Sequence, residues 1–325
     1  MSILANIVRD IRQVELETQS DTTENKLWSL STNNALPGLK KRGGYSWLLP
    51  THTAWGKDDK EEIDADLKDA QEKILDTISK IVSSGETIVD VSSLSKVADG
   101  RFRDAIINGI RKGYEAGHRP LIRLLWGKTP FLSVLQGDYG AIDKFVADIK
   151  RVAPGVPVVA ALANFEEIGH EKSWNHSKIV AADGRLAMVG GMNLWSSDYM
   201  SAGSTVTDLS VKVKGDAAKG AQQFLNEIWR YVEEKGSSSR YPKLSLSLNP
   251  TYAVSANITG KHYVKAIPEP AATIPESDSV PMLSVGRAAW LRNGRTTRAT
   301  NTTITKELKD FATGWLWDLV SRGGV

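Results

Sequence analysis

Apolar residues in the middle of the chain alternate between helical spacing and strand-like runs. Between Asp59 and Ser84 they recur every three or four residues, which predicts one face of a long helix that ends at Gly85. Together with the runs that follow, the expected helices are 59–84, 100–116 and 139–151, and the expected strands are 87–91, 121–126 and 156–162. This alternation predicts an α/β fold, an α/β/α sandwich in which a mixed, largely parallel sheet is flanked by helices.

Two further short apolar runs, 179–182 and 186–189, flank Asp183, Gly184 and Arg185. Asp-Gly between two apolar runs is a strong signal for a β-hairpin. A strand at 208–214 and a helix at 216–234 are expected next.

The helical spacing also predicts which side chains turn inward. In the first long helix these are Ile63, Leu67, Ala70, Ile74, Ile78 and Ile81. In the second they are Phe102, Ile106, Ile110 and Gly113. In the helix at 216–234 they are Ala217, Ala221, Phe224 and Ile228.

The character of the sequence changes after residue 236. Residues 266–281 hold four of the chain's 12 prolines, and one more strand is expected at 280–286. Helices are expected near the two ends, at 1–18 and 304–321. We therefore expect residues 1–236 to form the α/β domain. Residues 237–325 are expected to be a linker or covering segment and the start of a second half that is absent from this chain.

Composition narrows the possible chemistry. The 325 residues include 41 basic and 38 acidic side chains, a net charge of +3, so no strong basic field points to nucleic acid. The absence of cysteine excludes disulfides, a thiolate nucleophile and Cys-ligated zinc. No window approaches the roughly 18 consecutive apolar residues of a membrane span. With five histidines, histidine chemistry has few candidates.

One segment around the hairpin combines several groups that bind phosphate. His176 and Lys178 are two residues apart at the start of a strand, so both side chains point to the same face. Asn193 lies beyond the turn and the returning strand, and Gly190 and Gly191 allow a close approach of backbone or ligand. An imidazole, an ammonium group and an amide at one place predict a phosphate site in which the histidine attacks phosphorus or transfers a proton.

The complete spacing resembles the HxKxxxxDxxxxxxGGxN motif of the phospholipase D superfamily. Ser-Trp-Asn-His-Ser-Lys and Gly-Gly-Met-Asn-Leu-Trp-Ser-Ser-Asp-Tyr are most similar to secreted actinomycete-type bacterial phospholipases D, and a weaker likeness covers most of residues 45–290. The resemblance implies secretion, although a cytoplasmic location stays open because the N-terminus lacks the apolar core of a signal peptide.

The resemblance implies a role for each motif residue. His176 would be the nucleophile that forms a covalent phosphatidyl-histidine, while Lys178 and Asn193 would hold the non-bridging phosphate oxygens. Asp208 matches the carboxylate that hydrogen-bonds the other ring nitrogen of the nucleophile. Asp183 completes the set of candidate site residues, but its place at the turn predicts that it satisfies turn amides or pairs with a cation rather than touching substrate. No metal or other cofactor is implied.

The four remaining histidines are weaker candidates. His170 lies in a polar stretch and is expected to face solvent, His52 could line a rim, and His118 follows a glycine in a loop. His262 does not begin an HxK pattern and no GGxN follows it.

Family members build one active site from two such motifs, and this sequence holds one. It could be the N-terminal part of a two-motif enzyme whose C-terminal half is a separate polypeptide, a homodimer with one motif per subunit, or a non-catalytic relative. We favour the first. The expected activity is that of a phospholipase D acting on phosphatidylcholine-like lipids at a membrane or micelle surface, with possible transfer to alcohols. The alternatives are a phosphodiesterase or nuclease of the superfamily and a lipid-binding relative.

Overall fold

The computed structural model describes residues 28–38, 46–52, 58–127, 138–164, 174–200, 206–236, 251–269 and 273–285. The chain divides into two compact units, Met1–Ser31 with Pro281–Val325, and Thr32–Val280. In the first unit, strand β1 (Trp28–Ser31) pairs antiparallel with β11 (Met282–Val285). The strand expected at 280–286 is therefore present, whereas the helices expected at 1–18 and 304–321 lie outside the described residues.

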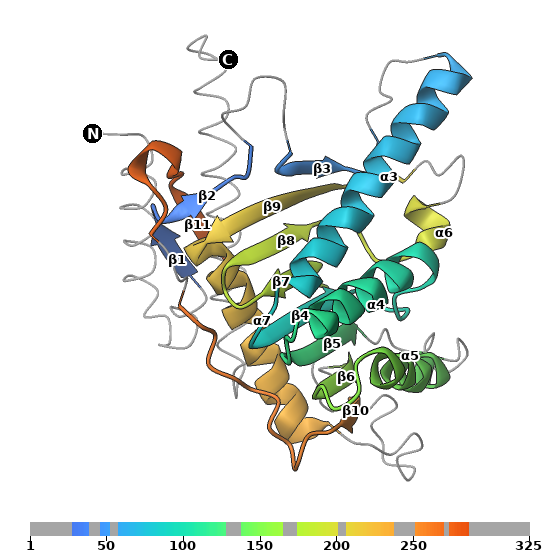
Figure 1. The fold of residues 1–325 in the computed structure, drawn as a ribbon, viewed down its shortest axis with the longest axis vertical. Coiled ribbons are helices and arrows are strands. Elements are labelled where there is room, and N and C mark those ends of the chain that lie inside the picture. Colours follow the sequence, from blue (N-terminus) through green and yellow to red (C-terminus); the bar gives the residue numbers. More distant parts are fainter. Residues whose placement is uncertain are drawn as a thin grey trace, which may run out of the picture. The chain divides into compact units, whose positions relative to one another are not determined.

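A nine-stranded sheet forms the centre of the second unit (Figure 1). Its strands are β2 (Asn34–Ala35), β3 (Leu48–Pro50), β4 (Ile88–Ser93), β5 (Leu121–Gly127), β6 (Val158–Ala163), β7 (Ile179–Ala182), β8 (Leu186–Gly190), β9 (Leu209–Gly215) and β10 (Tyr252–Ala256). They are arranged in the order β10-β6-β5-β4-β7-β8-β9-β2, and β3 also pairs with β9.

The sheet is mixed, as expected, but its parallel part is smaller than the sequence suggested. Only β4, β5 and β6 pair in parallel. The other pairings are antiparallel, including β4 with β7. β7 and β8 are antiparallel because the short turn at Asp183 and Gly184 joins them and reverses the direction of the chain.

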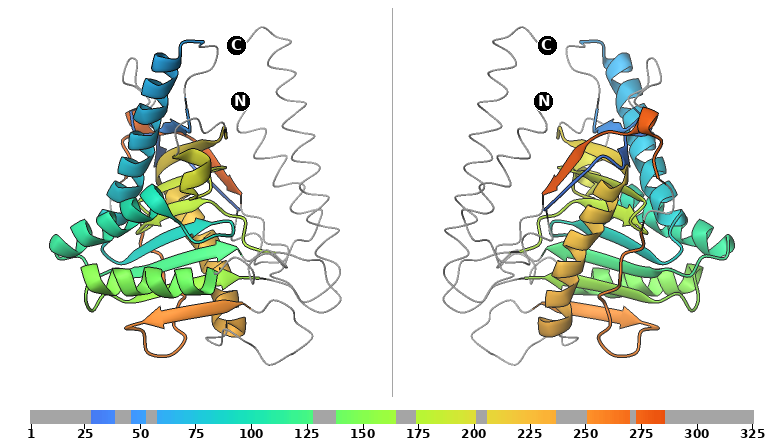
Figure 2. Two further views of the ribbon diagram at one scale, coloured as in Figure 1. Left: turned by 90° about the vertical axis from the view of Figure 1, so that its right-hand side faces the viewer. Right: turned by 90° about the vertical axis from the view of Figure 1, so that its left-hand side faces the viewer.

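Helices cover both faces of this sheet, which confirms the α/β class and the layered arrangement. On one face lie α3 (Lys60–Ser83), α4 (Gly100–Glu115) and α5 (Asp138–Val152), and on the other lies α7 (Asp216–Lys235) (Figure 2). The short helix α6 (Ser196–Tyr199) follows β8, and the 3-10 turn η1 (Glu276–Asp278) precedes β11. No described helix combines the length and the apolar character that a membrane span requires.

The inward faces of α3 and α4 agree closely with the helical spacing. Helix α3 begins at Asp59, whose side chain accepts a hydrogen bond from the Glu62 amide at 2.9 Å and so caps the first turn. Of the residues predicted to face inward on α3, Ile63 alone is only partly buried. Residues that are buried as predicted are Leu67, Ala70, Ile74, Ile78, Ile81, Phe102, Ile106, Ile110 and Gly113.

The prediction for α7 was partly wrong, because its buried face is rotated. Ile228 is buried as predicted, but the other buried positions are Ala218, Gln222, Leu225, Glu227, Trp229 and Val232. The reason is Gln222, a polar residue that faces the sheet because its amide donates to Asp90 at 2.9 Å. An apolar pattern does not count such a residue as part of the inward face.

The end of the α/β domain also differs from the expectation of a boundary after residue 236. Strand β10, which follows that point, pairs antiparallel with β6 and forms an edge of the sheet. Its Tyr252 side chain is buried in the same core cluster as α5. This part of the expected covering segment therefore belongs to the domain.

Candidate active site

Four of the five candidate residues lie at the end of the sheet where the parallel strands end. His176 and Lys178 precede β7, Asn193 follows β8, and Asp208 precedes β9. Since β7, β8 and β9 are successive antiparallel neighbours, these positions fall at one edge of the sheet. It is the edge at which β4, which pairs with β7, also ends. The carboxyl ends of parallel strands are where open α/β sheets bind ligands.

A buried polar network holds the segment that carries the histidine and the lysine. Asn175 is buried, and its amide nitrogen donates to the Ser92 hydroxyl at 2.9 Å. The Ser177 hydroxyl donates to the Asn175 side-chain oxygen at 2.7 Å and lies 2.6 Å from the Ser92 hydroxyl. Asn175 is buried, whereas His176 is exposed and Lys178 is half-buried, so the network anchors this segment and leaves the His176 side chain at the surface.

The surroundings of His176 and Lys178 lower the pKa of both side chains. They favour a neutral imidazole beside an ammonium group that loses its proton more readily than an ordinary lysine. Burial, and secondarily the charge of Lys178, lowers the pKa of His176 below its ordinary value. Burial lowers the pKa of Lys178 to about 8, although the nearby Asp208 carboxylate opposes the shift. The Lys178 ammonium donates to the His176 carbonyl oxygen at 2.9 Å. A neutral imidazole has the free lone pair that a nucleophile or general base needs.

The Asn193 side chain is oriented by the end of β4. The Ser93 hydroxyl accepts a hydrogen bond from the Leu194 amide at 3.2 Å, and its own proton points toward the Asn193 side-chain oxygen at 3.5 Å. The Asn193 amide group is thereby left as a hydrogen-bond donor to a ligand at the sheet edge.

Asp208 lies beside the motif, but its partner is not the one expected. Its carboxylate accepts a hydrogen bond from the Tyr199 hydroxyl at 2.5 Å. No hydrogen bond joins it to the His176 ring within the described residues, so its role as partner of that ring stays a prediction. A Cβ atom at Gly191 would overlap the other carboxylate oxygen, which explains the need for glycine at that position of the motif.

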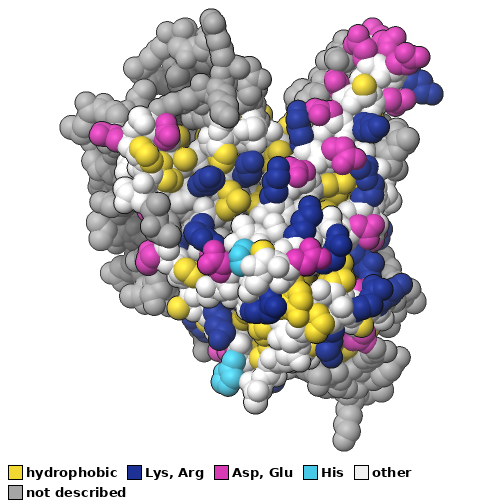
Figure 3. Space-filling view, in the orientation of Figure 1, with side chains coloured by type: hydrophobic (Ala, Val, Ile, Leu, Met, Phe, Trp, Pro, Cys, Tyr) yellow, Lys and Arg dark blue, Asp and Glu magenta, His cyan; other side chains and the backbone are white. Residues whose placement is uncertain are grey.

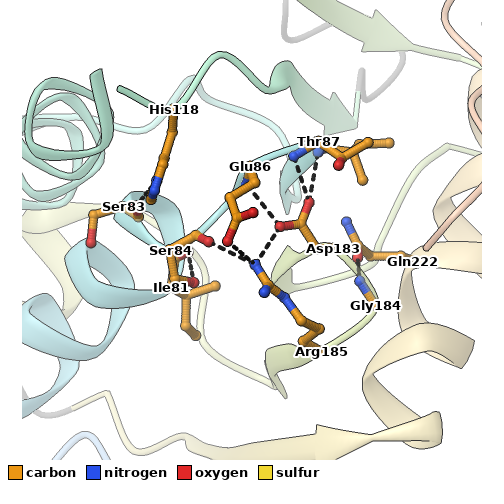
Figure 4. Close-up of polar contacts among 11 residues, drawn as sticks. Ile81, Ser83, Ser84, Glu86, Thr87, His118, Asp183, Gly184, Arg185 and Gln222 are labelled. Carbon is orange, nitrogen blue, oxygen red and sulfur yellow. Dashed lines mark hydrogen bonds and ion pairs between the residues drawn. The ribbon is translucent and has the colours of Figure 1, made fainter. Parts of the chain in front are cut away.

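Asp183 lies at the far end of β7 from the motif histidine and holds the chain that enters β4 (Figure 4). Its carboxylate accepts from the backbone amides of Glu86, Thr87 and Ile88 at 2.7, 2.9 and 2.8 Å and pairs with Arg185 at 2.7 Å. The expected pairing with a cation is present, but the amides that Asp183 satisfies belong to residues 86–88 rather than to its own turn. The structure does not bring it together with the other candidate residues.

The hairpin turn around Asp183 has the geometry that the Asp-Gly signal predicts. Asp183 and Gly184 have φ angles of 51° and 64°, the left-handed values that a type I′ turn requires. The Arg185 amide closes the turn by donating to the Ala182 carbonyl at 3.0 Å.

The three remaining histidines that the structure describes make their contacts outside the group of His176, Lys178 and Asn193. His52 comes nearest, since its Nε2 lies 2.7 Å from the Thr207 hydroxyl, next to Asp208. His118 contacts a carbonyl oxygen in the last turn of α3, and His262 is exposed. His170 lies outside the described residues. Within the described part of the chain, no group of three or more His, Asp or Glu side chains is arranged to hold a metal ion.

Comparison with known proteins agrees with this arrangement. A phospholipase D from Streptomyces antibioticus is 30% identical over 229 residues, which cover 69% of this chain and 39% of that protein. The chain belongs to the phospholipase D superfamily. It spans 39% of the length of this relative and carries the superfamily motif once, at His176. No family model matches the chain.

Two solved structures were also found to be similar. NucT from Helicobacter pylori has a TM-score of 0.36 and 15% identity, and the match covers 50% of this chain and 92% of that one. Nuc from Salmonella typhimurium, described as a phospholipase D family member, has a TM-score of 0.29 and 16% identity, with 47% and 82% covered.

Proposed function

We propose that this chain supplies one half of the active site of a phospholipase D. The enzyme would hydrolyse the distal phosphodiester bond of glycerophospholipids such as phosphatidylcholine and release phosphatidic acid and the head-group alcohol. The observation that carries the proposal is the convergence of His176, Lys178 and Asn193 at one edge of the sheet, in a chain 30% identical to a phospholipase D.

The geometry suggests that His176 has one chemical role and that Lys178 and Asn193 have another. The neutral His176 ring attacks phosphorus and forms a nitrogen–phosphorus bond as the bond to the head-group oxygen breaks. The leaving alcohol takes a proton from a general acid of the second motif. Lys178 and Asn193 donate to the non-bridging oxygens, whose negative charge grows in the five-coordinate transition state. Water, or an alcohol in transphosphatidylation, then attacks phosphorus and releases the histidine.

Surface character favours a lipid rather than a nucleic acid as substrate. The large hydrophobic side chains that are exposed among the described residues are Val189, Val206 and Leu209, at 36%, 40% and 45% exposure. Val189 lies near the end of β8, Val206 lies two residues before Asp208, and Leu209 is the first residue of β9. On the face drawn in Figure 3, basic and acidic side chains are interspersed rather than gathered in a basic stripe. An apolar margin around a phosphate site suits an amphiphilic substrate at a membrane or micelle surface.

The proposal includes a partner that carries the second motif. Of the five histidines, only His176 begins an HxK sequence followed by GGxN. We propose that a separate polypeptide, corresponding to the C-terminal half of the enzyme, supplies the other motif. The alternative source is a second copy of this chain.

The test compares two substrates with the protein purified together with its natural partners. We expect choline release from phosphatidylcholine vesicles and no cleavage of a single-stranded oligonucleotide. His176→Asn, which keeps the size and polarity of the side chain, should lower choline release by at least about a thousandfold because it removes the nucleophile. Near wild-type turnover in this variant would rule out the nucleophile assignment. Cleavage of the oligonucleotide alone would replace the lipase with a nuclease.

A further inference from the structure

One tyrosine hydroxyl connects two of the segments that form the site. Tyr199 ends the short helix α6 and is 4% exposed. Its hydroxyl donates to the Asp208 carboxylate at 2.5 Å, at the start of β9. Burial and this bond raise the pKa of Tyr199, whereas a backbone hydrogen bond with Asn193 opposes the shift. The same hydroxyl therefore interacts with the segments that follow β8 and precede β9.

Tyr199 is itself held from the helical layer. Its ring packs edge-on against Phe102 of α4, with ring centroids 6.5 Å apart and an interplanar angle of 78°. Its carbonyl oxygen accepts from the Gln71 amide of α3 at 3.1 Å. Gln71 is fixed in turn by Arg101, whose guanidinium donates to its side-chain oxygen at 2.8 Å. These contacts give the hydroxyl a defined position relative to the sheet.

We infer that Tyr199 is a positioning residue that fixes the Asp208 carboxylate near the Lys178 ammonium group and also holds the backbone of Asn193. A hydrogen bond from a hydroxyl to a carboxylate is among the stronger neutral-to-charged contacts, so it restrains one carboxylate oxygen and leaves the other to face Gly191 and the motif. The inference rests on the proposed function in one respect, because it takes the bound group to be a phosphodiester. In this inference Tyr199 acts through Asp208.

The test removes the hydroxyl and keeps the ring. Tyr199→Phe should weaken the binding of inorganic phosphate, measured by titration calorimetry, by about tenfold. It should lower kcat on soluble bis(4-nitrophenyl) phosphate by a similar factor. Phe102→Leu is the matched control, because it disturbs the packing of the same ring without removing the hydroxyl. This variant should lower the melting temperature but keep phosphate affinity and kcat within about twofold of wild type.

A double-mutant cycle separates positioning from a merely structural role. If Tyr199 acts through Asp208, Tyr199→Phe should have much less effect on phosphate affinity and kcat in the Asp208→Asn background than in wild type. Fully additive effects, wild-type values for Tyr199→Phe, or no phosphate binding by the wild-type protein would each overturn the inference. Weakened phosphate binding in Tyr199→Phe without hydrolysis of any phosphodiester by wild type would uphold the positioning role and refute the proposed function.

Discussion

Burial lowers the pKa values of His176 and Lys178, and these shifts predict how activity depends on pH. Protonation removes the lone pair of His176, so kcat/KM should fall on the acid side only below the ordinary histidine pKa of 6.5. On the alkaline side it should fall near pH 8, where Lys178 loses its proton. The measurement is kcat/KM for a soluble phosphodiester across this range. Lys178→Arg should remove the alkaline limb, because arginine stays charged there; a limb that persists would exclude Lys178 as its source.

Asp183 shows that a residue can belong to the motif without belonging to the site. Asp183→Ala would leave one buried and two partly buried backbone amides without their acceptor and would remove one of the partners of Arg185, and we expect a loss of about 3 kcal/mol in the free energy of unfolding. Urea titration measures this loss. The folded fraction should keep kcat/KM within about threefold of wild type. A large fall in kcat/KM at unchanged stability would instead return Asp183 to the catalytic residues.

How much of the site the sequence could predict depends on the kind of contact. His176, Lys178 and Asn193 could be identified because their spacing in the sequence, across a hairpin, predicts that the three side chains lie at the same end of the sheet. Ser93 and Tyr199 could not be identified in this way. Ser93 contacts Asn193, 100 residues further along the chain, and Tyr199 contacts Asp208, 9 residues further along. Each contact uses a single hydroxyl, which leaves no periodic signal in the sequence. Tyr199 does end the stretch that resembles the family, so its place in the sequence was visible although its contact was not.

At the level of helices and strands, the buried faces of α3 and α4, which are lined by apolar residues, were predicted well, whereas the buried face of α7, which includes a polar residue, was not. Arg123 of β5 and Asp90 of β4 form a fully buried pair with two hydrogen bonds, at 2.8 and 2.7 Å, on the face that α7 covers. Gln222 joins this cluster through Asp90. Buried charges must be paired and hydrogen-bonded, so this polar cluster fixes which face of α7 turns inward. Hydrophobic periodicity alone does not predict this polar cluster.

The end of β8 and the start of β9 carry exposed apolar side chains, and their effect on activity should depend on the physical state of the substrate. Leu209→Ser removes the most exposed of these side chains. We expect kcat/KM on phosphatidylcholine vesicles to fall by about tenfold, the equivalent of the roughly 1.4 kcal/mol that partial insertion of a leucine into lipid contributes. Activity on soluble bis(4-nitrophenyl) phosphate should stay within twofold, because that substrate offers no interface. Equal losses on both substrates would mean that Leu209 shapes the site rather than contacting lipid.

At the scale of the whole molecule, the described site supplies one histidine, one lysine and one asparagine, whereas the proposed mechanism needs a nucleophile on one side of phosphorus and a general acid on the other. One side chain cannot hold both positions in the same step, so we propose that the acid comes from a second motif across the phosphate from His176. This requirement is independent of the sheet topology, which positions only the groups around β7, β8 and β9.

The composition of the native complex decides where the second motif comes from. Native mass spectrometry of the purified protein should show this 35.5 kDa chain associated with a different polypeptide, and the sequence of that polypeptide should contain a second HxK followed by GGxN. Separation of the two under denaturing conditions should abolish turnover, and recombination should restore it, since neither half then holds both histidines. A species of twice the mass of this chain, active without any other polypeptide, would instead place His176 of two copies on opposite sides of one phosphate. In that arrangement His176→Asn mixed with wild type would leave heterodimers that lack one of the two histidines, and activity would fall more steeply than the fraction of variant chains.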